Sequence, residues 1–107
     1  MFNFTGGFMN PVFISHVIIS GSSIVIRGKT AENIETTIKV VSISDLNTEI
    51  AKEVFNKEFR VIPVYGDDGT PLGWATKRGS SLRIYNYDAG KVYHCSLQYT
   101  VVQPLEL

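Results

Sequence analysis

The sequence predicts an α+β protein that is mainly β: an antiparallel β-sandwich or partly open barrel of about seven strands, with one amphipathic helix over about residues 45–58 packed on it. Two observations predict this class. Short runs rich in β-branched and aromatic residues alternate with turn-forming Gly, Asp, Ser and Pro along most of the chain. A single segment, from Asp45 to Phe59, has apolar residues at helical spacing.

The predicted helix depends on Leu46, Ile50 and Val54, which recur at every fourth position and so share one helical face. Ser44 or Asp45 can cap its start, because a short oxygen-bearing side chain can accept a hydrogen bond from a free backbone N–H. A lone helix of about four turns is stable only when its apolar stripe packs on something. We therefore expect the flanking strands to form the surface on which this helix packs.

Three strands are expected before this helix, over residues 12–19, 24–27 and 34–43. The first is apolar on both alternating faces, which predicts cover on both sides, and Gly21-Ser22-Ser23 returns the chain as a hairpin. The third alternates apolar with polar residues until Val41, which predicts one wet face.

Four strands are expected after the helix, over residues 60–65, 72–76, 82–87 and 92–102. Pro63 predicts that the first of these lies at a sheet edge or contains a bulge, because proline cannot donate a ladder hydrogen bond. The segment from Gly66 to Pro71 is dense in turn residues, and Asp88 to Lys91 closes a final hairpin.

The chain of 107 residues is predicted to be one β-rich domain over residues 12–103, with an extended arm over 1–11 and a tail over 104–107. Ten basic and ten acidic residues cancel, which disfavours general polyanion binding. A single cysteine rules out an internal disulfide framework. The first residues lack the basic region of a signal peptide, and no run of about 18 apolar residues occurs. We expect a soluble protein without a membrane partner, cytoplasmic or part of a virion.

No residue pattern predicts catalysis, a cofactor or a metal. Asp67-Asp68-Gly69 resembles a calcium loop only in part, because the downstream acidic ligand is missing, so we expect its aspartates to bond their own backbone. His94 and Cys95 are adjacent and would point to opposite faces of a strand. We expect Cys95 to be a small buried thiol and His16 to be a hydrogen-bonded strand residue. The protein is predicted not to be an enzyme.

One candidate binding face combines aromatic and basic side chains between residues 74 and 93. Its members are Trp74, Lys77, Arg78, Arg83, Tyr85 and Tyr87. Three interpretations stay open: ordinary strand residues, a protein interface, in which Tyr, Trp and Arg are enriched, or a surface that stacks bases and meets phosphates. The cancelling charge places nucleic acid last.

Both chain ends are rich in large apolar side chains, which either pack on their own domain or dock on another copy. The leading hypothesis takes the second alternative, because so small a domain has difficulty covering them. The expected oligomer interface comprises Met1, Phe2, Phe4, Phe8, Met9, Leu105 and Leu107. The leading hypothesis is a non-catalytic structural subunit of a homo-oligomeric assembly, such as a small phage virion or tail component, by analogy with β-rich tail-tube proteins that carry one helix. Its partners would be other copies and neighbouring assembly proteins. The alternative is a small binding module, either a single-stranded nucleic-acid binder or an inhibitor that docks on a host protein.

Overall fold

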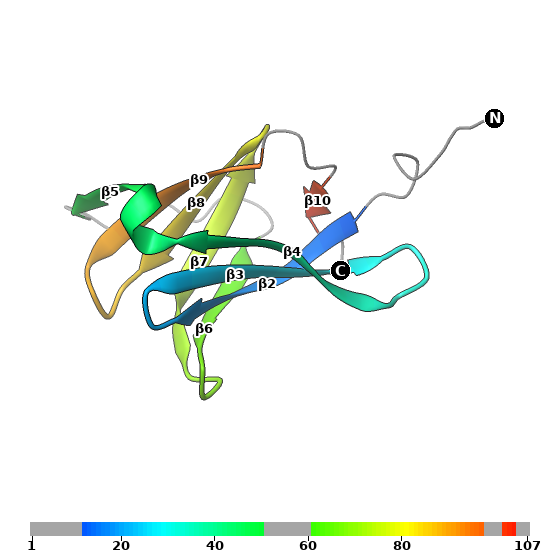
Figure 1. Ribbon diagram of the computed structural model, residues 1–107, viewed down its shortest axis with the longest axis horizontal. Helices are drawn as coiled ribbons and strands as arrows, with labels where there is room; N and C mark the ends of the chain where they lie inside the picture. Colours follow the sequence, from blue (N-terminus) through cyan, green and yellow to red (C-terminus); the bar gives the residue numbers. More distant parts are fainter. Residues whose placement is uncertain (1–11, 51–60, 98–101, 105–107) are drawn as a thin grey trace.

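The strands of this protein form one curled, mixed sheet that closes about half of a barrel (Figure 1). The structure is a computed structural model, and it describes residues 12–50 and 61–97 together with the backbone of residues 102–104. The strand order along the sheet is β4-β3-β2-β6-β7-β8-β9-β5, and β10 pairs with β2 beside this path. The partly open barrel is therefore the better of the two predicted architectures, since the described strands do not form two facing layers.

The described elements match the predicted strands roughly. Their bounds are β2 Val12–Ser20, β3 Ser23–Thr30, β4 Glu35–Ser42, the short 3-10 turn η2 Ile43–Asp45, β5 Asn47–Ile50, β6 Ile62–Gly66, β7 Pro71–Arg78, β8 Ser81–Asn86, β9 Lys91–Ser96 and β10 Val102–Pro104. The expected count of about seven strands is exceeded, because β5 and β10 were not expected as separate strands.

Each half of the sheet is built from neighbouring strands in antiparallel pairs. Strands β2, β3 and β4 form one meander, and β6 to β9 form another. Gly21, in the left-handed region with φ 59°, closes the first hairpin as its sequence predicts. In the last hairpin, the side-chain oxygen of buried Asn86 accepts hydrogen bonds from the backbone N–H groups of Asp88 and Ala89.

The two halves are joined by parallel pairing, which corrects the prediction of antiparallel pairing throughout. Strand β3 covers one side of β2 along its length, while β10 and β6 share the other side. Val102 pairs with Val12 at one end of β2, and Val64 pairs with Val17 at the other. Partners so distant along the chain have no local signature, which is why the sequence pattern did not reveal them.

The predicted helix over about residues 45–58 is wrong for its first part. Ile43–Asp45 make one 3-10 turn, and Asn47–Ile50 form β5, an antiparallel partner of β9. Residues 51–60 lie outside the described part of the chain. A spacing of four places Leu46 and Ile50 on one face of a helix, but four is also a multiple of two, so the same pair shares one face of a strand. The observed pairing with β9 shows that this segment is a strand and not a helix.

Pro63 does not lie in an edge strand, because β6 is central in the sheet, between β2 and β7. The bulge alternative is closer, since the register of β6 against β7 shifts between Val64 and Tyr65. Pairing with β2 starts only at Val64. The proline therefore precedes the short β2–β6 ladder and interrupts none of its described pairs.

The hydrophobic core fills the inner face of the curled sheet. Its buried members alternate along the strands with half-buried or exposed residues, as strand geometry requires. They are Ile14, Val17, Ile24, Ile26, Ile62, Val64, Ala75, Leu82, Ile84, Tyr93, Cys95 and Leu97. Burying one such aliphatic side chain contributes about 1.5–3 kcal/mol to folding. The core therefore draws on both halves of the sheet and holds them together.

The half-barrel has a seam where β4 faces β9 without strand pairing between them. The Lys39 ammonium of β4 crosses this seam and donates a hydrogen bond to the carbonyl oxygen of Ser96, with a distance of 2.5 Å between Nζ and O. A cavity of about 450 Å³ opens beside this contact, between β4, the η2 turn and β9. The seam is thus bridged by a side chain where a closed barrel would have a ladder.

Within the described residues, none of the helical turns is long and apolar enough to span a lipid bilayer.

Candidate binding surfaces

The strand register brings Trp74 and Tyr85 together on the outer face of the sheet. Trp74 of β7 pairs with Tyr85 of β8 on one side and with Pro63 of β6 on the other. The neighbouring residues Ala75 and Ile84 point inward and are fully buried. Strand alternation therefore forces the two aromatic side chains to the outside.

Three rings form one packed group, which we call the aromatic cluster: Trp74, Tyr85 and Tyr87. The centroids of Trp74 and Tyr85 are 4.8 Å apart at an interplanar angle of 59°, and Tyr87 lies 6.4 Å from each of them. The Tyr87 hydroxyl donates a hydrogen bond of 2.7 Å to the carbonyl oxygen of Pro71. Tilted rings at these distances attract one another, and each such pair contributes about 0.5–1.5 kcal/mol beyond its buried area.

The predicted basic members of this face are only partly brought together. Arg83 pairs with Thr76 and with His94, on the same outer face as Tyr85. Arg78 has the strand parity of Trp74 and also lies on this side. Lys77 pairs with Leu82, whose side chain is in the core, so Lys77 belongs to the opposite face of the sheet. Its inclusion in the candidate face is not supported by the register.

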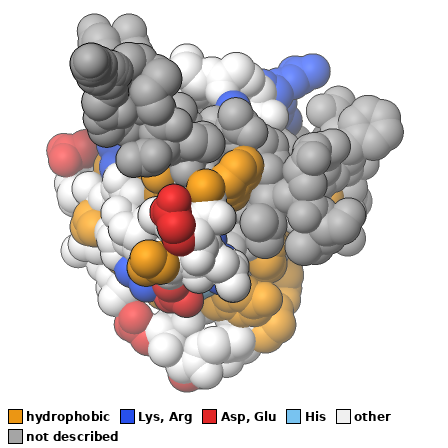
Figure 2. Space-filling view, turned by 90° about the vertical axis from the view of Figure 1, so that its right-hand side faces the viewer, with side chains coloured by type: hydrophobic (Ala, Val, Ile, Leu, Met, Phe, Trp, Pro, Cys, Tyr) orange, Lys and Arg blue, Asp and Glu red, His pale blue; other side chains and the backbone are white. Residues whose placement is uncertain are grey.

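The outer face continues beyond Arg83 to a hydrogen-bonded contact between a histidine and a glutamate. His94 of β9 and Glu49 of β5 approach to 2.5 Å between Nε2 and Oε2. This contact places an acidic side chain beside the basic part of the face. Figure 2 shows that the side of the molecule that it presents also mixes acidic and basic side chains without a field of one sign.

This arrangement suits protein contact better than base stacking. A base stacks on the open face of a ring, but the three rings of the aromatic cluster are tilted against one another by 41° to 59°. Tyr87, with 49% of its surface exposed, is the most accessible of them. The cluster therefore offers a compact apolar patch.

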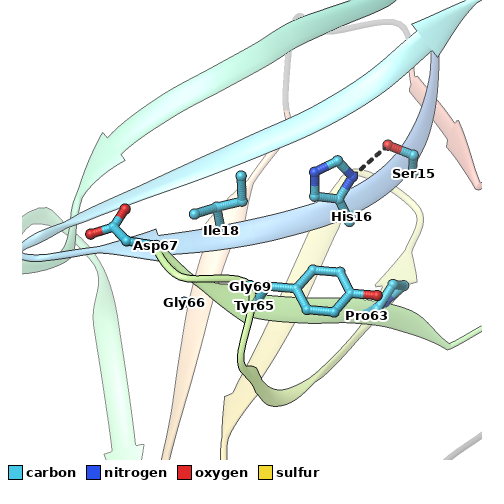
Figure 3. Close-up of a pocket in the computed structure, with 8 residues that line it drawn as sticks. All are labelled: Ser15, His16, Ile18, Pro63, Tyr65, Gly66, Asp67 and Gly69. Atoms are coloured by element: carbon cyan, nitrogen blue, oxygen red, sulfur yellow. Dashed lines mark hydrogen bonds between the residues drawn. The ribbon is translucent and has the colours of Figure 1, made fainter.

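A second site, which the sequence reasoning missed, lies on the outer face between β2 and β6 (Figure 3). A bulge in β2 between Ile14 and His16 places Ser15 and His16 side by side, with 2.8 Å between the serine hydroxyl and imidazole Nδ1. The ring of His16 meets that of Tyr65 edge to face, at 5.9 Å and 63°. The expectation of a hydrogen-bonded strand histidine at position 16 is confirmed.

The protonation of His16 is set by its surroundings. Burial lowers the pKa of His16 below its usual value of 6.5. The nearby Glu35 carboxylate opposes this shift, while Arg27 and Lys29 add to it. Arg27 and Glu35 are themselves an ion pair, 2.5 Å apart. His16 is therefore neutral at pH 7 and can both donate and accept hydrogen bonds. Only the parallel pairing of β2 with β6 creates this site, so no local motif signals it.

The cysteine and the aspartate turn have the roles expected from the sequence. Cys95 is 1% exposed and faces the core, while His94 faces outward. Burial raises the pKa of the Cys95 thiol, which makes it a poor nucleophile. Asp68 accepts a 3.0 Å hydrogen bond from the backbone N–H of Thr70, and this bond lowers the pKa of its carboxyl group. In the described ranges, His, Cys, Asp and Glu side chains do not gather into a metal-binding group.

The expected oligomer interface falls outside the described residues. This applies to Met1, Phe2, Phe4, Phe8, Met9, Leu105 and Leu107. Of the predicted tail, Pro104 is the last residue of β10.

Comparisons of the chain with protein-family models, curated proteins and solved structures give no match.

Proposed function

We propose that this protein is a non-catalytic subunit of a homo-oligomeric assembly in which the edge of β4 carries a contact between copies. The observation that supports it most is the combination of an open strand edge with exposed aliphatic side chains. Among the described strands, β4 pairs only with β3, so one side of its backbone lacks a strand partner. Such an edge is a template for pairing with another chain.

The side chains of this edge favour association. Val40, within β4, is 58% exposed, and Ile34, just before it, is 61% exposed. Lys39, which could protect the edge by its charge, instead crosses the seam to Ser96. The edge therefore presents apolar surface together with backbone groups that have no strand partner among the described residues.

The other end of the sheet is a second open edge. Strand β5 pairs only with β9 among the described strands, and its Ile50 is 73% exposed. Contact between β4 of one copy and β5 of the next would be head-to-tail, which produces rings or filaments. Two copies of β4 paired about a two-fold axis would give a dimer. The mass of the assembly separates these arrangements.

The proposal is limited to self-assembly. Its extension to a small phage virion or tail component rested partly on a helix over residues 45–58, and β5 removes the first part of that helix. The apolar ends of the chain remain a proposed second contact, because their side chains lie outside the described residues.

Light scattering during size-exclusion chromatography tests the proposal. We expect the native chain to run as an oligomer. Val40→Lys should lower the mass of the assembly, because it places a charge at the edge where copies would meet. Val61→Lys is the matched control: Val61 is 36% exposed, immediately before central β6, and the change should leave the mass unaltered. Deleting residues 1–10 measures the separate contribution of the N-terminal arm. A native chain that remains monomeric at about 100 μM, a concentration well above the Kd of stable assemblies, would refute the proposal.

A second candidate function, a binding module that docks on another protein, is favoured by the aromatic cluster. Aromatic and arginine side chains dominate binding energy at protein interfaces, and Arg83 lies beside Tyr85 on the same face. This function predicts a monomer that co-purifies with one partner, and loss of that partner in Tyr87→Ala. The two functions predict different masses for the isolated chain in solution: an oligomer for the first and a monomer for the second.

A further inference from the structure

The outer face between β2 and β6 contains a hollow of about 320 Å³. Small-molecule sites in proteins begin at roughly this size, about 300 Å³. The hollow is built from two strands that pair in parallel and from the turn that follows β6, so its walls come from segments far apart in the sequence. None of its lining residues belongs to the aromatic cluster or to the edge strands β4 and β5, although Pro63 is the ladder partner of Trp74.

The walls of the hollow are rings and aliphatic groups. His16 and Ile18 project from β2, and Pro63 and Tyr65 project from β6 opposite them (Figure 3). The imidazole and the phenol ring stand edge to face, 5.9 Å apart between centroids. Surfaces of this kind attract a planar apolar group. The Ser15 contact on Nδ1 fixes the orientation of the imidazole and leaves Nε2 for a ligand.

One charged group lies at the far end of the hollow from Ser15, the carboxylate of Asp67 (Figure 3). Asp67 is exposed, and its carboxylate has no hydrogen-bond partner within the described residues. Its neighbour Asp68 differs, because it accepts the hydrogen bond from Thr70 that shapes the turn. Three charges on the His16 side act on the imidazole without lining the hollow: Arg27 and Glu35, which are paired with each other, and Lys29. Asp67 is therefore the charged side chain that lines the hollow itself.

We propose that this hollow binds a small planar aromatic amine, whose ring lies against His16 and Tyr65 and whose ammonium group meets the Asp67 carboxylate. The apolar walls supply most of the affinity, and the carboxylate supplies preference for a cation. An ion pair at an exposed carboxylate is weak. The charge should therefore change affinity by no more than about fivefold.

Three probes with one ring and different charge test this assignment on the full chain: tryptamine, indole and indole-3-acetate. Binding is followed by amide chemical shifts in two-dimensional ¹H–¹⁵N NMR spectra. We expect tryptamine to bind two- to fivefold more tightly than indole, and indole-3-acetate to bind most weakly, with shifts centred on Ile18 and Gly66 to Gly69. Equal affinity for the three probes, or tightest binding of the anion, overturns the role of Asp67. No localised shifts up to about 10 mM of any probe overturns the site.

Two matched pairs of variants separate the contribution of the Asp67 charge from that of the Tyr65 ring. Asp67→Asn should remove the preference for tryptamine over indole, while Asp68→Asn, one position along the same turn, should keep it. Tyr65→Leu should weaken the binding of all three probes, while Tyr87→Leu, in the aromatic cluster, should leave their binding unchanged. A preference for tryptamine that survives Asp67→Asn contradicts the proposal even if Tyr65→Leu fails to fold. Asp67 lies outside β4 and β5, so the contact proposed through those edges does not use it and the two proposals can fail separately.

Discussion

The imidazole of His16 shows how a single residue acquires properties that its neighbours in sequence do not determine. Its strand position and its hydrogen bond to Ser15 follow from local sequence. Its contact with Tyr65 and its partial burial require β6, which reaches β2 only through parallel pairing. The sequence therefore predicts a bonded histidine but not a neutral one beside a hollow.

The lowered pKa of His16 makes stability depend on pH in a defined direction. Above the unfolded value near 6.5, both states carry a neutral imidazole. As the pH falls below this value, the unfolded state takes up the proton first, so folding stability decreases until the folded pKa is passed. We expect urea unfolding to show a smaller loss between about pH 7 and pH 5.5 for His16→Asn than for the native chain. A His16 ring proton that titrates at or above 6.5 would contradict this.

Other single residues were predictable where the rule is local. Cys95 and His94 point to opposite faces because neighbours in a strand always do. Asp68 bonds the backbone two residues ahead, as aspartates in turns do. Lys77 lies three residues from Trp74 in the same strand, so alternation places it on the opposite face, and its pairing with the core residue Leu82 agrees.

At the scale of elements, turn residues predicted the hairpins well, while hydrophobic periodicity predicted a helix where the chain forms the strand β5. The strands β2, β3, β7 and β8 lie roughly where alternation and turn chemistry predict them, whereas β9 ends at Ser96 and falls short of the expected 92–102. For β5, Leu46 and Ile50 satisfied the helical and the extended period together, and a four-residue strand is too short to break that tie. Contact with β9 is the missing information, and it is not local.

The ladder between β7 and β8 requires a glycine at position 73. A Cβ atom there would lie 1.8 Å from the carbonyl oxygen of Tyr85, which is backbone and cannot move aside cheaply. We expect Gly73→Ala to lower the free energy of unfolding by about 3 kcal/mol or more. Gly66→Ala is the control, because its Cβ would meet its neighbours at 3.4 Å, an ordinary contact. Equal urea midpoints for the two variants would show that β7 and β8 are further apart than described.

At the scale of the whole molecule, the sequence predicted a β-rich body with a partial barrel among its forms. It could not decide how strands from the two halves meet, because the β2–β6 and β2–β10 pairs join residues that have no shared pattern. The inner face was predictable from alternation along β9 and the residue after it, where Tyr93, Cys95 and Leu97 are all buried. The closing seam, bridged by Lys39, was not.

A shared core predicts that stability is lost from both halves together. Ile84, fully buried in β8, contacts a core that also contains Ile26 of β3. We expect Ile84→Ala to lower the free energy of unfolding by about 2–5 kcal/mol. Ile34→Ala, at a site that is 61% exposed, should change it by less than about 0.5 kcal/mol in dilute solution. Separate unfolding transitions for the two halves in Ile84→Ala would contradict a common core.

The parallel pairing of β10 with β2 also sets the order in which this protein can fold during synthesis. Hairpins such as β2–β3 can form within microseconds of leaving the ribosome. The other side of β2, by contrast, cannot be completed until Val102–Pro104 have been translated. Until then the first strand has a partly unpaired backbone, and a nascent chain in this state is open to pairing with its neighbours on the same messenger RNA.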